Sequence, residues 1–215
     1  MIFFVDAEVE KIFFLGDTVG YFPEPVNAIE LLLSVQASCM LGNHDAMLIE
    51  RIEIDERKDR VYQIRKTRDK SPCRYLQQMA TWLPYLQLQI DSKKILMVHG
   101  SPWNPLNEYV YPDADLKNFA RLPFDFIFMG HTHRPFIRKS GDVTLVNVGS
   151  CGLPRDQGNL ASCAIFDTET GERNIHRIPF NAENLIKQYG NAIHSSVVSC
   201  LRRESHQIVG KMVAR

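Results

Sequence analysis

Residues 124–133 read Phe-Asp-Phe-Ile-Phe-Met-Gly-His-Thr-His, an apolar run that stops at two histidines spaced one residue apart. Most of its apolar residues do not alternate with polar ones, which is typical of a strand covered on both faces. In layered α/β folds, ligand sites lie beyond the carboxyl ends of such strands. The stretch therefore predicts a buried strand that delivers His131 and His133 to a site at its end.

Other apolar runs end in the same way, at a polar or glycine-rich turn. These runs cover residues 11–15, 38–41, 94–98 and 143–147, and the turns after them are Gly16-Asp17, Gly42-Asn43-His44-Asp45, His99-Gly100 and Val148-Gly149-Ser150. A helix is predicted over residues 25–36, where Pro25 suits a first helical turn, and a longer charged helical stretch over 46–83. Strands separated by helices indicate an α/β layered fold.

The last third of the chain follows another pattern. Residues 160–166 and 174–178 flank Asp167-Thr-Glu-Thr-Gly171, which predicts a β-hairpin with a glycine-containing turn. Two helices are predicted after it, over residues 182–189 and 192–213. Because no linker or repeat separates these parts, we expect a single domain over residues 1–215, with a core at 11–180 and C-terminal helices at 182–215.

Composition argues against several classes of protein. The 215 residues include 25 basic and 25 acidic ones, so no long-range attraction to nucleic acid or anionic membrane is expected. The five cysteines are odd in number and form no Cys-x-x-Cys pair, which argues against a disulfide framework or a zinc ribbon. The chain shows no secretory signal and no membrane-length apolar run, which favours a cytoplasmic protein.

Five potential metal ligands follow four of the predicted strands: Asp17, Asn43, His99, His131 and His133. Imidazole, carboxylate and amide oxygen together suit divalent manganese, iron, zinc or nickel. The lack of cysteine among them argues against a structural zinc site. An aspartate can bridge two cations, and paired cations about 3.5–4 Å apart are a common device for phosphate-ester hydrolysis. The pattern therefore predicts a metal centre for phosphate chemistry.

The motifs Gly16-Asp17, Gly42-Asn43-His44-Asp45, His99-Gly100 and Gly130-His131-Thr132-His133 resemble, in order, those of calcineurin-like metallophosphoesterases. The small bacterial and archaeal phosphodiesterase branch is the most similar, because Asn147-Val-Gly-Ser150 and Pro154-Arg-Asp156 resemble its Asn-Pro-Gly-Ser and Pro-Arg-Asp segment. The resemblance runs from about residue 11 to residue 180. It implies a four-layer α-β-β-α sandwich, with two central mixed sheets flanked by helices.

The resemblance also implies a role for each matching residue. Asp17 would bridge two metals, His133 would bind the first, and Asn43, His99 and His131 would complete the second site. His44 would protonate the leaving oxygen or stabilise the transition state, while Asp45 would orient His44. Arg155 would contact a substrate phosphate oxygen. The implied reaction is hydrolysis of a small phosphodiester or phosphomonoester by a metal-bound hydroxide, with manganese as the expected cation.

The sequence departs from the family pattern at its start. The family's first strand carries an Asp-x-His motif, whereas no histidine precedes Asp17 here. Asp6-Ala-Glu8 is a poor substitute, because neighbouring parallel strands need a crossover of about a dozen residues. We expect instead that residues 2–5 end the first helix and that residues 9–15 form the family's second strand. Two explanations are open. The start codon is mis-assigned or the chain is truncated, which is the explanation we favour, or the protein is naturally shortened.

This departure leads to two further expectations. The first metal keeps only Asp17 and His133, so the first site should be weak and the second competent. A different class of function also stays open, since the chain could be a non-catalytic relative that uses the same surface to bind a partner. A phosphoprotein phosphatase is a third alternative, because a fold by itself does not select a substrate.

Overall fold

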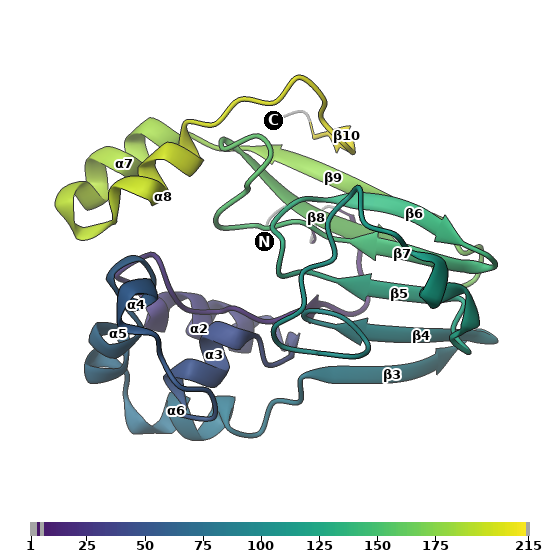
Figure 1. Cartoon of the computed structure of the whole chain (residues 1–215), viewed down its shortest axis with the longest axis horizontal. Helices are drawn as coiled ribbons and strands as arrows, with labels where there is room; N and C mark the ends of the chain where they lie inside the picture. The colour runs from purple at the N-terminus through teal and green to yellow at the C-terminus, as the bar shows by residue number, and fades with distance from the viewer. Residues whose placement is uncertain (1–3, 5–6, 214–215) are drawn as a thin grey trace.

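The computed structural model describes residue 4 and residues 7–213 of the chain. Its larger sheet has five strands in the order β3-β4-β5-β7-β6 (Figure 1). These are β3 (Tyr85–Ile90), β4 (Lys93–Val98), β5 (Phe126–Met129), β6 (Phe136–Ser140) and β7 (Val143–Asn147). The strands β4, β5 and β7 are parallel, with Val98, Met129 and Asn147 in register. The loops that follow these three strands therefore start from one edge of the sheet.

A second β layer packs on this sheet. It contains the parallel pair β1 (Phe13–Phe14) and β2 (Ser38–Cys39), and the set β8 (Leu160–Phe166), β9 (Arg173–Pro179) and β10 (Lys211–Met212). Side chains of both groups, including Phe13, Met40 and Phe166, share one apolar cluster with Phe126 and Phe128 of the larger sheet. This cluster is the core between the two layers.

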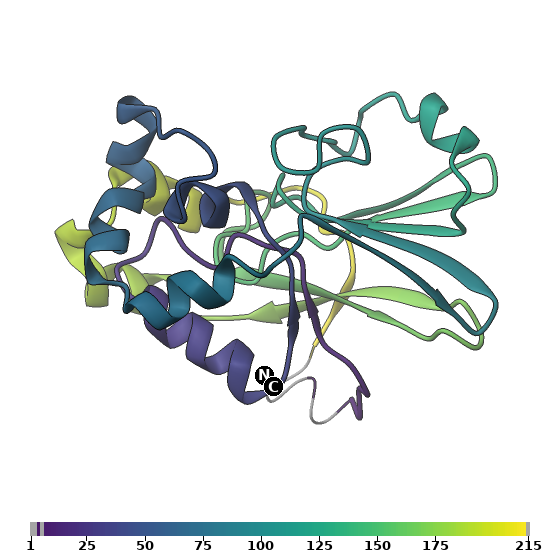
Figure 2. The same cartoon turned by 90° about the horizontal axis from the view of Figure 1, so that it is seen from below.

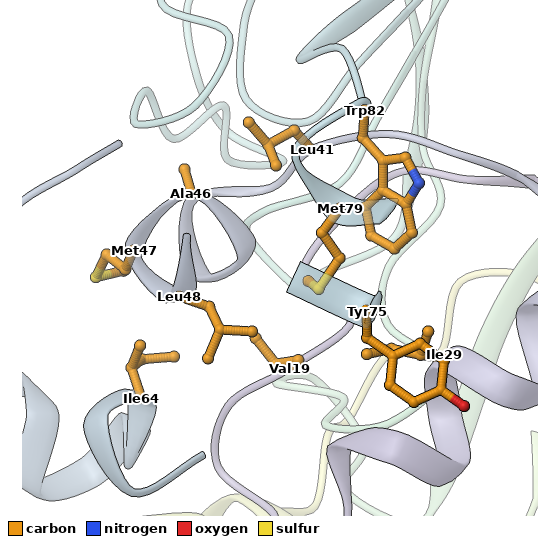
Figure 3. Packing of buried hydrophobic residues seen from close by; sticks show 10 residues of the cluster. All are labelled: Val19, Ile29, Leu41, Ala46, Met47, Leu48, Ile64, Tyr75, Met79 and Trp82. Atoms are coloured by element: carbon orange, nitrogen blue, oxygen red, sulfur yellow. The ribbon is translucent and has the colours of Figure 1, made fainter. Parts of the chain in front are cut away.

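The α-helices gather at one end of the two layers and build apolar cores of their own (Figure 1). They are α2 (Pro25–Ser34), α3 (Asn43–Leu48), α4 (Glu56–Tyr62), α5 (Ile64–Lys70), α6 (Cys73–Met79), α7 (Ala182–Tyr189) and α8 (Ser195–Leu201), with 3-10 turns η1 (Lys117–Arg121) and η2 (Gly190–Ala192). Figure 3 shows Ile29, Leu48, Ile64 and Met79 meeting from four different helices, each fully buried. Figure 2 shows α7 and α8 at the same end of the molecule as α2 to α6. Within the described residues, none of the helices has the length and apolarity needed to cross a bilayer.

The predicted α/β sandwich is confirmed, and so are its main elements. Strands occur in all five predicted apolar runs, the hairpin is present, and α7 has the predicted bounds. The prediction missed β3 and β6, which are the two outer strands of the larger sheet. In β3 the side chains alternate between exposed and half-buried. An outer strand carries no long apolar run, which was the pattern used to find strands.

Two predicted helices are wrong in extent. The stretch 46–83 divides into several short helices, and Gln63 has φ +56° between α4 and α5. The predicted helix 192–213 ends at Leu201, and the chain then extends so that β10 pairs with β9. Gly210 has φ +107° and passes so close to Ile175 that a Cβ would lie 2.8 Å from its carbonyl oxygen. A glycine there permits pairing with the sheet in place of a helix.

The expected helix end at residues 2–5 falls mostly on residues 1–3 and 5–6, which lie outside the described residues, whereas the expected strand over 9–15 falls on described ones. Among the residues described, strand structure in the stretch 9–15 is confined to β1.

Candidate metal centre

Four predicted ligands meet beyond the ends of β1, β2, β4 and β5. The His99 Nε2 atom lies 3.2 Å from Asn43 Oδ1, 3.3 Å from Asp17 Oδ2 and 3.0 Å from His131 Nδ1. Ligand atoms of Asp17, His99 and His131 all lie within 4.8 Å of one another. The structure therefore brings together side chains that are up to 114 positions apart in the sequence.

The strand beside it orients His99. Its Nδ1 donates to the Leu15 carbonyl oxygen at 2.7 Å, so Nε2 faces the cluster. Burial disfavours a charge on this ring, but the Asp17 carboxylate outweighs burial and raises the pKa of His99. The carboxylate and amide oxygens around Nε2 are acceptors, and one proton on Nε2 cannot serve both oxygens and the His131 ring at once. A divalent cation is the group that satisfies these acceptors, so the residues fit the metal that the sequence predicts.

The two histidines after β5 are neutral. Burial, with a smaller effect of His99, lowers the pKa of His131 to about 3. Burial and the Arg155 charge lower the pKa of His133 to about 3. The His133 Nδ1 atom donates to the Leu153 carbonyl oxygen at 2.7 Å, which leaves Nε2 free as an acceptor. His133 is not one of the three residues grouped within 4.8 Å, and its ring packs edge-on against Tyr21.

The loops that carry these ligands adopt unusual backbone angles. Asp17, His131 and His133 have φ values of +59°, +63° and +58°, in the left-handed region that side chains other than glycine rarely adopt. Such angles persist only when the surrounding structure enforces them, and they are concentrated at functional sites. Gly42 supplies part of that enforcement, because it passes so close to Asp17 that any side chain there would collide with the carboxylate.

His44 and Asp45 both hold Asp17, although in different ways from those implied by the resemblance. The His44 backbone N–H donates to Asp17 Oδ1 at 2.9 Å. His44 is 2% exposed, and its ring packs against those of Tyr62 and Tyr21, at centroid distances of 4.2 and 4.9 Å. Both oxygens of the Asp45 carboxylate accept backbone N–H groups from Asp17, Thr18 and Gly42. Asp45 thus orients the Asp17 loop through backbone groups, whereas the Nδ1 atom of the His44 ring has no hydrogen-bond partner among the described residues.

Arg155 reaches the same site from the loop after β7. Its Nη2 donates to the Tyr21 hydroxyl at 2.7 Å, and its guanidinium lies 5.9 Å from the Tyr21 ring centroid. Its backbone N–H donates to the His133 carbonyl oxygen at 3.1 Å. Arg155 therefore brings a positive charge beside His133.

Three residues of the site were not assigned a role from the sequence. Tyr62 covers His44, and Tyr109 stacks on His131 with ring centroids 3.8 Å apart. The Asn147 side chain donates to the Gly130 carbonyl oxygen and to Thr132 Oγ1, so it supports the loop of His131 and His133. Tyr62 lies in a charged helical stretch with no motif to distinguish it. Tyr109 follows the proline-containing loop after His99, and this position was the one sequence feature that could have marked it as a residue of the site.

Comparison with known proteins agrees with this geometry. A family model described as the calcineurin-like phosphoesterase superfamily domain matches residues 3–171. The chain belongs to this superfamily. An uncharacterized protein of Methanocaldococcus jannaschii is 30% identical over 80% of this chain and 77% of its own length. Phosphodiesterase YfcE of Escherichia coli is 23% identical over 83% of this chain and 96% of YfcE.

Solved structures of similar proteins share the fold. A metallophosphoesterase from Sphaerobacter thermophilus superposes with a TM-score of 0.77 at 26% identity, covering 93% of this chain and 91% of that one. A hypothetical protein from Pyrococcus horikoshii gives a TM-score of 0.79 at 21% identity, with coverages of 94% and 89%, and this match concerns the fold alone. The predicted family and sandwich are confirmed, and the chain is a metal-dependent phosphoester hydrolase of this superfamily.

Proposed function

We propose that this chain hydrolyses a phosphodiester or phosphomonoester with a divalent cation held by Asp17, Asn43, His99 and His131. The observation that carries the proposal is the cluster of acceptor atoms around His99 Nε2, at 3.0–3.3 Å. Manganese is the expected cation, and iron, nickel or zinc suit the same ligands. When bound, such a cation neutralises phosphate oxygens and lowers the pKa of a bound water.

The first metal site, where a further cation would share Asp17, would use His133. The free Nε2 of His133 and the depressed pKa of its imidazole support this role, because a neutral ring is the form that binds metals. Fewer ligands are available for this cation among the described residues than for the cation held by Asn43, His99 and His131. We therefore infer that it binds more weakly.

Arg155 and His44 would act on the substrate. Arg155 places a guanidinium next to the cluster. It hydrogen-bonds to Tyr21 and to Tyr109, and since a guanidinium has five N–H groups, others can donate to phosphate oxygens. Burial lowers the pKa of His44, so its resting form is neutral. A bound phosphate anion would favour the protonated form, which can donate to a leaving oxygen.

The experiment compares hydrolysis of bis(p-nitrophenyl) phosphate and p-nitrophenyl phosphate by the metal-stripped protein with and without added Mn²⁺. Hydrolysis should depend on the metal and should fall by about 100-fold or more in Asn43→Ala. The matched control is His206→Ala, an exposed residue outside the site. Hydrolysis that resists chelation, or that survives in Asn43→Ala, would overturn the proposal. Metal binding without hydrolysis of either ester would favour the non-catalytic binding alternative.

A further inference from the structure

Two tyrosine rings extend from the metal centre to the surface. The Tyr109 ring stacks on His131, with centroids 3.8 Å apart and planes 24° apart. The Tyr111 ring is nearly parallel to that of Tyr109, at 5.7 Å and 7°. Both tyrosines are 41% exposed. The pair therefore presents aromatic surface to solvent directly beside a proposed cation ligand.

The residue between the two tyrosines fixes their direction. Val110 is buried, and it packs with Leu116 and Phe119 in the apolar cluster on the outer face of the larger sheet. Val110 is buried while the tyrosines on either side of it stay 41% exposed, so Val110 anchors the loop inward and both tyrosines remain open to solvent. The parallel rings are thus a consequence of how this loop is anchored.

Hydrogen bonds hold the loop on both sides of the pair. Ahead of it, the Gly100 N–H donates to the Pro105 carbonyl oxygen at 2.6 Å, and the Glu108 N–H donates to the Asn104 carbonyl oxygen at 3.3 Å. Behind it, the Arg138 guanidinium donates to the carbonyl oxygens of Pro112 and Ala114, at 2.9 and 2.7 Å. A loop that is already ordered loses little entropy when a ligand binds it.

Exposed aromatic side chains are few in the rest of the described structure. Besides this pair, the exposed aromatic side chains of the described residues are Tyr85 and Trp103. Trp103 packs on Phe119 and Tyr85 lies in β3, so neither ring packs on a proposed metal ligand. The position of the pair at the metal centre is therefore specific to Tyr109 and Tyr111.

We propose that the Tyr109–Tyr111 pair binds a planar aromatic group of the substrate, such as a nucleobase or an aryl ring attached to the phosphate. This rests on the proposed function, because it assigns a substrate class to the same site. Flat aromatic groups stack on tyrosine rings with little dependence on the identity of the ring. The substrate would then be anchored at two points, by its phosphate at the cation and by its ring on the tyrosines.

The test measures binding by calorimetry in Mn²⁺, with phosphorus NMR to verify that each ligand stays intact. Adenosine 5′-monophosphate is compared with ribose 5-phosphate, and phenylphosphonate with methylphosphonate. We expect the ring-bearing member of at least one pair to bind about tenfold more tightly, as stacking of one base predicts. The pair that shows the preference identifies the source of the ring as nucleobase or simple aryl group.

Variants test whether this preference for ring-bearing ligands depends on the tyrosines. Tyr111→Leu should reduce the affinity ratio within that pair to about twofold or less, whereas Tyr111→Phe, which keeps the ring, should preserve the ratio. Tyr85→Leu removes an exposed tyrosine elsewhere and should leave the ratio unchanged. Equal affinity for both members of each pair, or a ratio that survives in Tyr111→Leu, would overturn the inference.

The outcomes also separate this inference from the proposed function. If the protein hydrolyses a phosphodiester in the presence of Mn²⁺ but shows no preference for ligands with a ring, the proposed function is supported and the binding role of the Tyr109–Tyr111 pair is refuted. If it binds none of the four phosphorus compounds and hydrolyses no ester, both proposals fail.

Discussion

Asp45 fixes Asp17 through the backbone, because Asp45 Oδ2 accepts the Asp17 N–H at 2.7 Å. The same oxygen accepts the Gly42 N–H at 2.9 Å, and Oδ1 accepts the Thr18 N–H at 2.9 Å. Asp45 has no exposed surface. A single buried carboxylate therefore joins the loop after β1, which carries Asp17, to the start of α3, which carries Asn43.

Asp45→Asn should destabilise the fold and weaken the metal site together. An asparagine has one acceptor oxygen, and its NH₂ group would face a backbone N–H, so at least one buried donor loses its partner. We expect the free energy of unfolding to fall by about 3 kcal/mol in urea denaturation, with weaker Mn²⁺ binding. Asp115→Asn, at an exposed position, should change it far less. Equal effects of the two substitutions would show that the carboxylate has no such role.

Gly42→Ala should displace Asp17 without straining its own backbone, since Gly42 has φ −93°. The added Cβ would lie 2.2 Å from Asp17 Oδ1 and 2.3 Å from Asp17 N, so the ligand loop has to shift. Because a shift of about 1 Å can cost 100-fold in rate, we expect a loss of about 100-fold in kcat/KM. Gly152→Ala is the matched control, as a Cβ there meets no atom within 4 Å. Similar rates for both variants would contradict the prediction.

The parts of the fold that the sequence predicted are those governed by local pattern. Continuous apolar runs identified β4, β5 and β7, which are covered on both faces, and Asp17, Asn43, His99 and His131 follow such runs. The carboxyl ends of parallel strands lie at the same edge of a sheet. Residues that directly follow such strands in the sequence could therefore be predicted to converge.

The parts that could not be predicted depend on tertiary contacts. The apolar residues Ile208 and Met212 fit a helix as well as they fit the extended tail that pairs with β9, and only contact with Ile175 selects the strand. The Asp45 carboxylate reaches loops up to 28 residues away, and no sequence pattern specifies that its partners are backbone groups. Tyr62 and Tyr109 reach the site by folding of segments that carry no motif.

Metal analysis should find about one tightly held manganese ion per chain after gel filtration, since one complete set of four ligands converges in the described structure. His131→Ala removes one of these ligands and should weaken Mn²⁺ binding by about 100-fold or more, measured by calorimetry. His206→Ala retains all of them and should keep the ion. Two ions per chain that survive gel filtration would mean that the site of Asp17 and His133 is stronger than we expect.

Breaking the buried ion pair of β9 should destabilise the fold more than breaking an exposed one. Arg177 has no exposed surface; its guanidinium binds both oxygens of Asp156, next to Arg155, and donates to the Leu160 carbonyl oxygen at 2.9 Å. Arg177→Met leaves the Asp156 charge largely buried and unpaired, so we expect a loss of about 3–5 kcal/mol in urea denaturation.

The exposed pair Arg202–Glu183 is the matched control for that measurement. It has the same two-bond geometry, but its side chains are 56% and 52% exposed. Water screens such a pair, so Arg202→Met should cost far less stability than Arg177→Met. The double variant Arg177→Met/Asp156→Leu removes both buried charges and should recover part of the stability lost in Arg177→Met. If the two single variants lose equal stability, burial does not determine the contribution of the β9 pair.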